Sequence, residues 1–417
     1  MTVFQGVGAL FTLVAIFGYL NHRFVRLPDT LGITAVGLLV SVLVAGVATL
    51  FPDVHIARQA QDLASQIDFT DVVFHGLLSL LLFAGSLHVD LAKLRQHRLA
   101  VVLLATVGVL ISTAVVGFGF YFVARAFGFD ISLLWCLAFG ALISPTDPIA
   151  VLGVLKNAGA APAVESKIAG EALFNDGTAV VAFLTLVGLA AGTTEFSAAA
   201  ISTALAREVF GGVLVGLAVG YGASFLLRDL DSYAVEILVT LAMATGGYSL
   251  AELLHVSAPL AVVIMGLVLG NHGATKHMTE KTREHLYNFW HLVDELLNLV
   301  LFGLIGLEVI ALAFNLRDIW LGIAAVPVVL LARLASVGIP LSALRRFRQS
   351  SPHAVKIMTW GGLRGGISIA LALSLPAFEG RDMVIGVTYV VVIFSLLVQA
   401  TTLGALVRRY SASPVEA

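Results

Sequence analysis

Residues 144–181 read SPTDPIAVLGVLKNAGAAPAVESKIAGEALFNDGTAVV, and this stretch decides how the rest of the chain is interpreted. Prolines stand on both sides of a Thr-Asp pair within an otherwise apolar segment. Four acidic residues lie in or beside apolar runs here: Asp147, Glu165, Glu171 and Asp176. A carboxylate inside a membrane is costly and usually functional, and an interrupted helix is tolerated there only against protein or a cavity. The stretch therefore predicts an ion or proton site within a membrane.

The composition of the chain is that of a membrane protein. Of its 417 residues, 59% are hydrophobic and 12% are charged, and the mean hydropathy is +0.98. The 40 glycines suit close approach of helices in lipid. The net charge of −2 argues against a nucleic-acid partner. The single cysteine, Cys136, excludes an intrachain disulfide and a multi-cysteine metal site. We expect a lipid environment and no cofactor.

About thirteen apolar stretches are long enough to span a bilayer, which takes roughly 20 residues. No basic residue precedes the first stretch, so we interpret it as a retained span rather than a signal peptide. The approximate limits are 4–21, 29–51, 69–89, 99–126, 132–155, 165–191, 205–227, 232–253, 256–271, 286–312, 318–342, 354–377 and 383–407. These stretches predict an all-α, polytopic membrane protein without a soluble regulatory domain.

Lysine and arginine concentrate in the loops that follow odd-numbered stretches, as Lys93, Arg95 and Arg98 do after the third. Positive residues favour cytoplasmic loops, so we expect the N-terminus outside and the C-terminus in the cytoplasm. An odd number of spans also places the two termini on opposite sides of the membrane. We expect the protein in the bacterial cytoplasmic (inner) membrane.

Two of the apolar stretches are interrupted at matching places. The fifth contains Ser144-Pro145-Thr146-Asp147-Pro148, and the twelfth contains Gly361-Gly362-Leu363-Arg364-Gly365-Gly366. They lie seven stretches apart, so they cross the membrane in opposite directions. Paired interrupted helices predict an inverted-repeat transporter whose site lies at the midplane. The repeats would cover about 4–191 and 232–407, joined by a linker helix at about 205–227.

Asp176 is the first candidate for ion and proton binding. It lies in the middle of the sixth stretch, next to Asn175. Burial disfavours the charged carboxylate, so such a group can hold either a proton or a desolvated monovalent cation. That competition is sufficient for exchange. The alternative is a buried Asp that caps a neighbouring helix, and the second polar group, Asn175, favours the site.

Thr146 and Asp147 are the second candidates. Pro148 has no N–H and Pro145 disfavours a helical Ser144, so the backbone here is expected to unwind and to expose carbonyl oxygens. A hydroxyl and free carbonyls are suitable ligands for a hard cation. A simple proline kink is the alternative, and the charge of Asp147 favours a site.

Glu171 and Arg364 are isolated charges in apolar stretches, so we predict that they form an ion pair. The expected division is Glu171 for structure and Asp176 for transport, although the sequence leaves the reverse assignment open. Arg333, in the eleventh stretch, is likewise expected to pair. Asp294 and Glu295, in the tenth, either lie at the membrane interface or line a funnel.

The two interruptions and the segment Gly170-Glu171-Ala172-Leu173-Phe174-Asn175-Asp176-Gly177 together resemble the monovalent cation/proton antiporter family, in its NhaP/NHE-type sodium/proton antiporter branch. The resemblance covers nearly the whole chain. It implies a homodimer and an Asn-Asp pair matched by Asn175 and Asp176, with the Asp as carrier. It also implies that Thr146 and the backbone at Asp147 help to bind Na⁺, and that a Glu–Arg bridge is matched by Glu171 and Arg364.

The sequence departs from the family pattern at two positions. The residue after the motif Glu is commonly Ser in the family and is Ala172 here, and a Glu common in the third span corresponds to Ala84. Both departures remove a possible oxygen ligand, which leaves the choice between Na⁺ and K⁺ open.

Three functional interpretations follow. The first is electroneutral exchange of Na⁺ (or Li⁺ or K⁺) for H⁺ by alternating access, with K⁺/H⁺ exchange on the same scaffold as the nearest alternative. The second is a sodium-coupled solute symporter, which requires a solute pocket. The third, an intramembrane enzyme, is disfavoured because the chain has no G-x-S-x-G, H-E-x-x-H or G-x-G-D motif.

Overall fold

The computed structural model describes residues 3–50, 72–193, 197–230, 232–273, 278, 280–309, 316–345 and 353–411. Within these ranges the chain is almost entirely helical and contains no strand. Among the described residues, eight helices are long and apolar enough to cross a membrane, and four shorter apolar helices accompany them. Within the described residues, each of the predicted apolar stretches falls on one to three consecutive helical elements, so the predicted all-α membrane fold is confirmed.

The N-terminal half of the chain supplies the first interrupted helix and the long helix that follows it. Its elements are α1 (Val3–Leu20), η1 (Asn21–Val25), α2 (Asp29–Leu50), η2 (Val72–Leu77), α5 (Leu78–Leu87), α6 (Leu91–Gln96), α7 (Arg98–Leu103), η3 (Leu104–Gly108), α8 (Val109–Ala126), α9 (Leu133–Leu142), α10 (Pro148–Ala158) and α11 (Pro162–Ala190). Residues 144–147 separate α9 from α10 and are not helical.

The C-terminal half supplies the second interrupted helix. Its elements are α12 (Ala198–Leu226), η4 (Leu227–Asp229), α13 (Tyr233–Leu253), α14 (Ala258–Val268), η5 (Leu269–Gly273), α16 (Glu280–Glu308), α17 (Leu316–Arg345), α18 (Ala354–Trp360), α19 (Gly366–Leu373), α20 (Arg381–Phe394), η6 (Ser395–Gln399) and α21 (Ala400–Ser411). Residues 362–365 separate α18 from α19 and are not helical.

Two helices begin earlier than the hydropathy predicted. The helix α12 begins at Ala198 rather than near 205, and α16 begins at Glu280 rather than near 286. In α16 the added turn is polar, since it reads EKTREH. Hydropathy detects only the part of a helix that is apolar, whereas a helix can continue beyond the apolar window through residues of good helix propensity.

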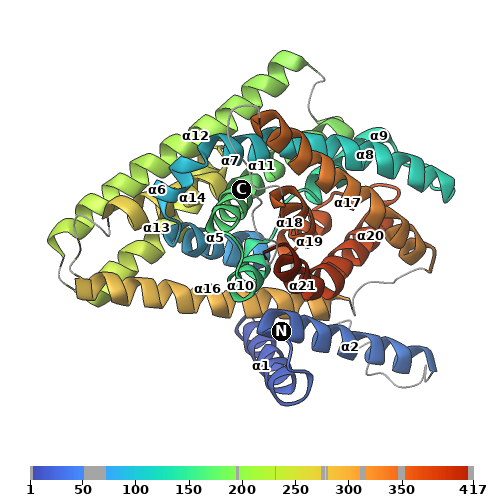
Figure 1. The fold of residues 1–417 in the computed structure, drawn as a ribbon, viewed down its shortest axis with the longest axis horizontal. Helices are drawn as coiled ribbons and strands as arrows, with labels where there is room; N and C mark the ends of the chain where they lie inside the picture. The colour runs from blue at the N-terminus through green and yellow to red at the C-terminus, as the bar shows by residue number, and fades with distance from the viewer. Residues whose placement is uncertain are drawn as a thin grey trace.

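The buried apolar residues form two clusters. The larger includes residues of α8, α9, α17 and α20, and the smaller includes residues of α5, α13 and α14. The helix α16 belongs to both, with Leu286 and Trp290 in the smaller cluster and Phe302 and Ile305 in the larger. Figure 1 shows α16 along one edge of the molecule, with α1 and α2 on its outer side. The segment of α16 around residues 294–298 therefore lies at the junction of the two clusters.

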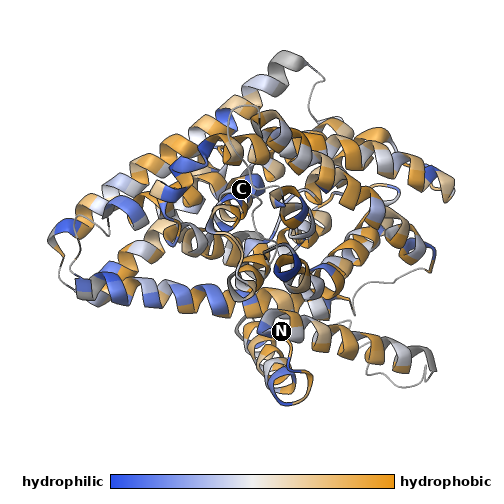
Figure 2. Ribbon diagram, viewed as in Figure 1, coloured by the Kyte–Doolittle hydropathy of each residue, from blue (hydrophilic) through white to orange (hydrophobic). Residues whose placement is uncertain are grey.

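The outer helices expose large apolar side chains. Phe122 of α8, Phe210 and Leu214 of α12, and Leu331 of α17 are all more than half exposed. Hydrophobic residues cover these helices in Figure 2. Such a surface is unusual for a protein in water and suits contact with lipid. The predicted division into two repeats and a linker helix remains a prediction.

Candidate ion-binding site

The two interrupted helices meet at their breaks. The backbone N–H of Asp147, in the first break, donates a hydrogen bond of 2.8 Å to the carbonyl of Leu363, in the second. The backbone N–H of Arg364 donates to Ser395 Oγ at 2.9 Å. The unwound residues therefore satisfy part of their backbone hydrogen bonding across the crossing, which makes the breaks tolerable in an apolar environment.

Proline and glycine permit this close approach. Pro148 occupies the first position of α10, where its missing N–H costs nothing. A Cβ atom added to Gly365 would lie 2.6 Å from Asp147 Oδ2, so any larger residue would collide with the first break. Gly366 begins α19 and lies against the side chain of Leu301. Pro145, Gly361 and Gly362 complete the two interruptions.

Arg364 lies in the crossing, where its side chain is only 2% exposed. Its Nη1 atom donates to the carbonyl of Ser144 at 2.6 Å and to that of Pro145 at 3.0 Å. These carbonyls follow the C-terminus of α9, where helix carbonyls lack intrahelical partners and the helix dipole is negative. Arg364 therefore serves as a cationic cap for the broken end of α9.

The prediction that Glu171 forms an ion pair with Arg364 is wrong, because Glu171 has a different partner. Arg333 of α17 pairs with Glu171 instead: its Nη2 donates to Glu171 Oε2 at 3.0 Å, and its Nη1 contacts Oε1. Arg333 Nε also donates to the carbonyl of Met358 at 3.3 Å. The physical reason is that the carbonyls of the first break occupy Arg364, while Gly362 has no side chain and leaves room for the Arg333 guanidinium to reach Glu171. The general expectation that Arg333 pairs is confirmed.

Asn175 and Thr146 are joined directly. Asn175 Nδ2 donates to Thr146 Oγ1 at 2.8 Å, and both side chains are almost completely buried. The bond holds the Thr146 hydroxyl in place and leaves its own hydrogen and one lone pair available. Asn175 thus connects α11 to the first break.

Asp176 lies one residue further along α11 and is 4% exposed. Within the described part of the chain, no group donates a hydrogen bond to its Oδ1 atom. A buried carboxylate oxygen without a donor is energetically costly unless the group is protonated or binds a cation.

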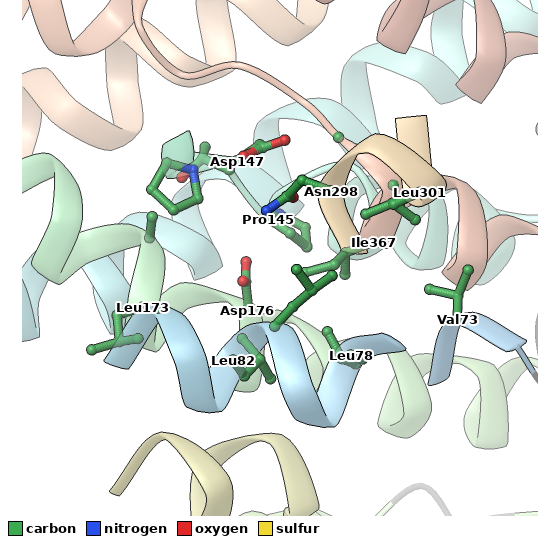
Figure 3. A pocket seen from close by; sticks show the side chains of 17 residues that line it. Val73, Leu78, Leu82, Pro145, Asp147, Leu173, Asp176, Asn298, Leu301 and Ile367 are labelled. Carbon is green, nitrogen blue, oxygen red and sulfur yellow. The ribbon is translucent and has the colours of Figure 1, made fainter. Parts of the chain in front are cut away.

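A cavity of about 90 Å³ contains Asp176 and the first break. Figure 3 shows the carboxylates of Asp147 and Asp176 on opposite sides of it. Its remaining wall is mostly apolar. The lining residues are Val73, Leu78, Leu81, Leu82, Gly85, Pro145, Thr146, Asp147, Pro148, Ala172, Leu173, Asp176, Asn298, Leu301, Gly365, Gly366 and Ile367. Among the predicted ion-binding residues, the structure brings Asp176, Thr146 and Asp147 to this cavity, with Asn175 directly behind Thr146.

The two positions that depart from the family pattern differ in location. Ala172 lines the cavity, one helical turn before Asp176. Ala84 is fully buried and is not part of the lining, whereas its neighbours Leu81 and Gly85 are.

Sequence reasoning missed Asn298 of α16, which lines the cavity with a 2% exposed side chain. Its Nδ2 donates to the carbonyl of Asp294 at 2.7 Å and to the Asp294 carboxylate at 3.2 Å. A signal was available, since Asn298 is an isolated amide in an apolar run and follows Asp294 by one helical turn.

These features define a class: a multi-pass helical membrane transporter with two crossed, interrupted helices around a buried carboxylate. The family described as "Sodium/hydrogen exchanger, transmembrane" matches residues 10–409. The chain belongs to this family, so it is a transporter and not an enzyme.

Two relatives extend over nearly the full chain. The Na⁺/H⁺ antiporter NhaP of Pseudomonas aeruginosa is 45% identical, over 98% of this chain and 98% of its own. The Na⁺/H⁺ antiporter NhaH of Halobacillus aidingensis is 34% identical, over 93% of each chain.

A solved structure has the same fold. The sodium proton antiporter MjNhaP1 from Methanocaldococcus jannaschii matches with a TM-score of 0.75, covering 99% of this chain and 100% of its own, at 18% sequence identity. This likeness confirms the predicted fold class of crossed, interrupted helices.

Proposed function

We propose that the protein exchanges Na⁺ for H⁺ across the membrane, with the cation and the proton competing for Asp176. The observation that carries the proposal is the buried Asp176 carboxylate, which faces a cavity beside the helix crossing and has an oxygen without a described donor. Relatives that cover nearly the whole chain are named Na⁺/H⁺ antiporters. That support favours Na⁺ over K⁺ as the exchanged cation.

The exchange cycle follows from charge balance at the cavity. A protonated Asp176 is neutral and needs no counterion, and an ionised Asp176 is neutralised by one monovalent cation. Either form can move through a low-dielectric region at lower cost than the bare carboxylate. One carboxylate exchanging one proton for one monovalent cation gives electroneutral transport by alternating access.

The local residues have separate roles in this proposal. Asp176 binds the ion or the proton, while Thr146 and the backbone at Asp147 contribute oxygen ligands. Asn175 holds the Thr146 hydroxyl through its 2.8 Å hydrogen bond. Arg364 keeps the first break open by binding its carbonyls, and the Glu171–Arg333 pair fixes α11.

We further propose a homodimer in the bacterial inner membrane, with the N-terminus outside, the C-terminus in the cytoplasm and the two repeats at about 4–191 and 232–407. Cysteine-accessibility labelling at the two termini tests the orientation, and cross-linking in native membranes tests the dimer.

The exchange activity is tested with purified protein in liposomes that contain a pH-sensitive dye. A Na⁺ gradient should move protons in the opposite direction, and clamping the membrane potential with valinomycin and K⁺ should not change the rate. Proton flux driven by K⁺ in the absence of valinomycin, without flux driven by Na⁺, would identify a K⁺/H⁺ exchanger instead. Absence of salt-driven proton flux from folded protein would contradict antiport and favour a solute symporter.

A further inference from the structure

Asn298 lines a different wall of the cavity from the residues assigned above. The groups assigned above come from α11 and the first break, whereas Asn298 comes from α16, at the junction of the two apolar clusters. In Figure 3 the Asn298 side chain lies between Asp147 and Asp176 in the view. An amide at this place is isolated among apolar lining residues such as Leu301 and Ile367.

The hydrogen bonds of Asn298 determine which end of its amide is available. Both atoms of Asp294 that it contacts, the backbone carbonyl and a carboxylate oxygen, accept hydrogen bonds. Only the NH₂ group of an asparagine can donate to them, so the nitrogen must face Asp294. The oxygen Oδ1 is therefore left over, and within the described chain no group donates to it.

Asn271 provides an internal comparison. Its Nδ2 likewise donates to the carbonyl four residues earlier, Leu267, at 3.0 Å, and also to the carbonyl of Val89 at 2.8 Å. Its Oδ1, however, accepts a hydrogen bond of 2.9 Å from the backbone N–H of Leu91. Asn271 thus uses both ends of its amide in holding the fold together, whereas Asn298 uses the nitrogen end alone.

We propose that Asn298 Oδ1 is a ligand of the transported cation, and that Asp294 is a positioning residue that orients the amide. A desolvated cation needs several oxygen ligands, and besides Asn298 the polar side chains among the described lining residues are those of Thr146, Asp147 and Asp176. A neutral amide oxygen adds a ligand without adding charge, so it strengthens cation binding and leaves proton binding at Asp176 almost unchanged. This inference rests on the proposed cation/proton exchange.

The test compares the Asn298→Ala and Asn271→Ala proteins with the unmodified protein in the liposome assay. Asn298→Ala should raise the apparent KM for Na⁺ about tenfold, which corresponds to about 1.4 kcal/mol of lost cation binding, with little change in the maximal rate. Asn271→Ala should lower thermal stability and leave the KM for Na⁺ unchanged. If Asn298→Ala fails to fold, Asn298→Leu keeps the same branching and the same number of side-chain heavy atoms and also removes the oxygen.

A binding measurement separates ligation from a structural role. Na⁺ should raise the melting temperature of the unmodified protein in detergent relative to choline, because a bound ion stabilises the folded state. The Na⁺-dependent shift should be much smaller in Asn298→Ala, while the melting temperature in choline changes little. Asp294→Ala should have an intermediate effect, since the Asp294 carbonyl still holds the amide.

The outcomes distinguish this inference from the function on which it rests. If the unmodified protein shows no Na⁺-driven proton flux, the proposed exchange itself is wrong. If the unmodified protein exchanges Na⁺ for H⁺ and Asn298→Ala has the same KM and the same Na⁺-dependent melting shift, the exchange stands and the ligand role of Asn298 is overturned. An equal increase in KM in Asn271→Ala would also overturn it.

Discussion

Glu171 of α11 and Arg333 of α17 form an ion pair through both carboxylate oxygens, and their side chains are only 3% and 6% exposed. Glu171 precedes Asp176 by five residues on α11, whereas Arg333 belongs to α17. The pair therefore links α11, which carries Asp176, to α17. Because the pair is buried and bidentate, its two members depend on each other strongly.

Loss of either partner of this pair should destabilise the protein by about 3–5 kcal/mol, because the remaining charge is buried without compensation. We therefore expect both Glu171→Gln and Arg333→Ala to lower the melting temperature in detergent, and the double variant to lose less than the sum of the two. The same cycle with Arg364→Ala is the matched control and should show weaker coupling. Stronger coupling of Glu171 to Arg364 than to Arg333 would restore the pairing predicted from the sequence.

Arg333 and Arg364 show which part of the site could be predicted from the sequence and which part could not. Apolar stretches, prolines and glycines are local features, and they located the helices and both breaks correctly. They also directed the search for a site to Asp176, which the structure places in the cavity. The partner of Glu171 depends on where two distant arginines project after folding, and both are isolated charges in apolar runs. The hydrogen bonds of Arg364 to carbonyls of the first break could not be read from the sequence, because they exist only once the breaks meet.

Asn298 was missed for a related reason. Asn298 carries no charge, so in this stretch the charged Asp294 and Glu295 give the stronger signal. In the structure Glu295 is exposed and contacts His291 at 3.5 Å, whereas Asp294 is partly buried and bonded to Asn298. The two adjacent residues therefore have different surroundings, because neighbours on a helix point about 100° apart.

Arg364→Lys should destabilise the crossing although it keeps the charge. Arg364 Nη1 donates to the carbonyls of both Ser144 and Pro145, and a lysine ammonium on a flexible stem does not reproduce the planar guanidinium. Each buried carbonyl left without a donor costs about 1–3 kcal/mol. A lower melting temperature and a reduced exchange rate are expected, and wild-type values for both would show that charge alone is sufficient at this position.

Asp176→Asn should abolish exchange while the protein still folds, because the substitution removes the titrating group and preserves its shape. The matched control is Glu165→Gln, which makes the same chemical change in the first turn of α11, away from the cavity. The control should exchange at nearly the normal rate in the liposome assay. Substantial Na⁺-driven proton flux by folded Asp176→Asn protein would remove Asp176 from the mechanism.

Thr146→Val should weaken Na⁺ binding, because it replaces the hydroxyl with a methyl group of similar size. Asn175 Nδ2 then loses its acceptor, so a loss of about 1–3 kcal/mol in stability is expected as well. Thr146→Ser keeps the oxygen and should retain both stability and the apparent KM for Na⁺. A normal KM in the Val variant would mean that the hydroxyl does not contact the ion.

Ala172→Ser tests whether the cavity is short of oxygen ligands. Ala172 is 1% exposed, lines the cavity and precedes Asp176 by one helical turn, so a hydroxyl there would point toward the ion beside the carboxylate. The change adds one oxygen and little volume. The apparent KM for Na⁺ should fall more than that for K⁺, because the smaller ion gains more from a tighter oxygen cage.

The same substitution can be combined with Asn298→Ala. If the two side chains supply oxygens to one ion, Ala172→Ser should recover part of the Na⁺ affinity that Asn298→Ala loses, and the two effects should not be independent. Apparent affinities for Na⁺ and K⁺ must be measured at several pH values, since proton competition at Asp176 shifts both. An unchanged Na⁺/K⁺ affinity ratio in a variant that folds and transports normally would mean that residue 172 does not face the ion. The ligands of the cation, apart from the Asp176 carboxylate, would then come from the first break and α16 alone.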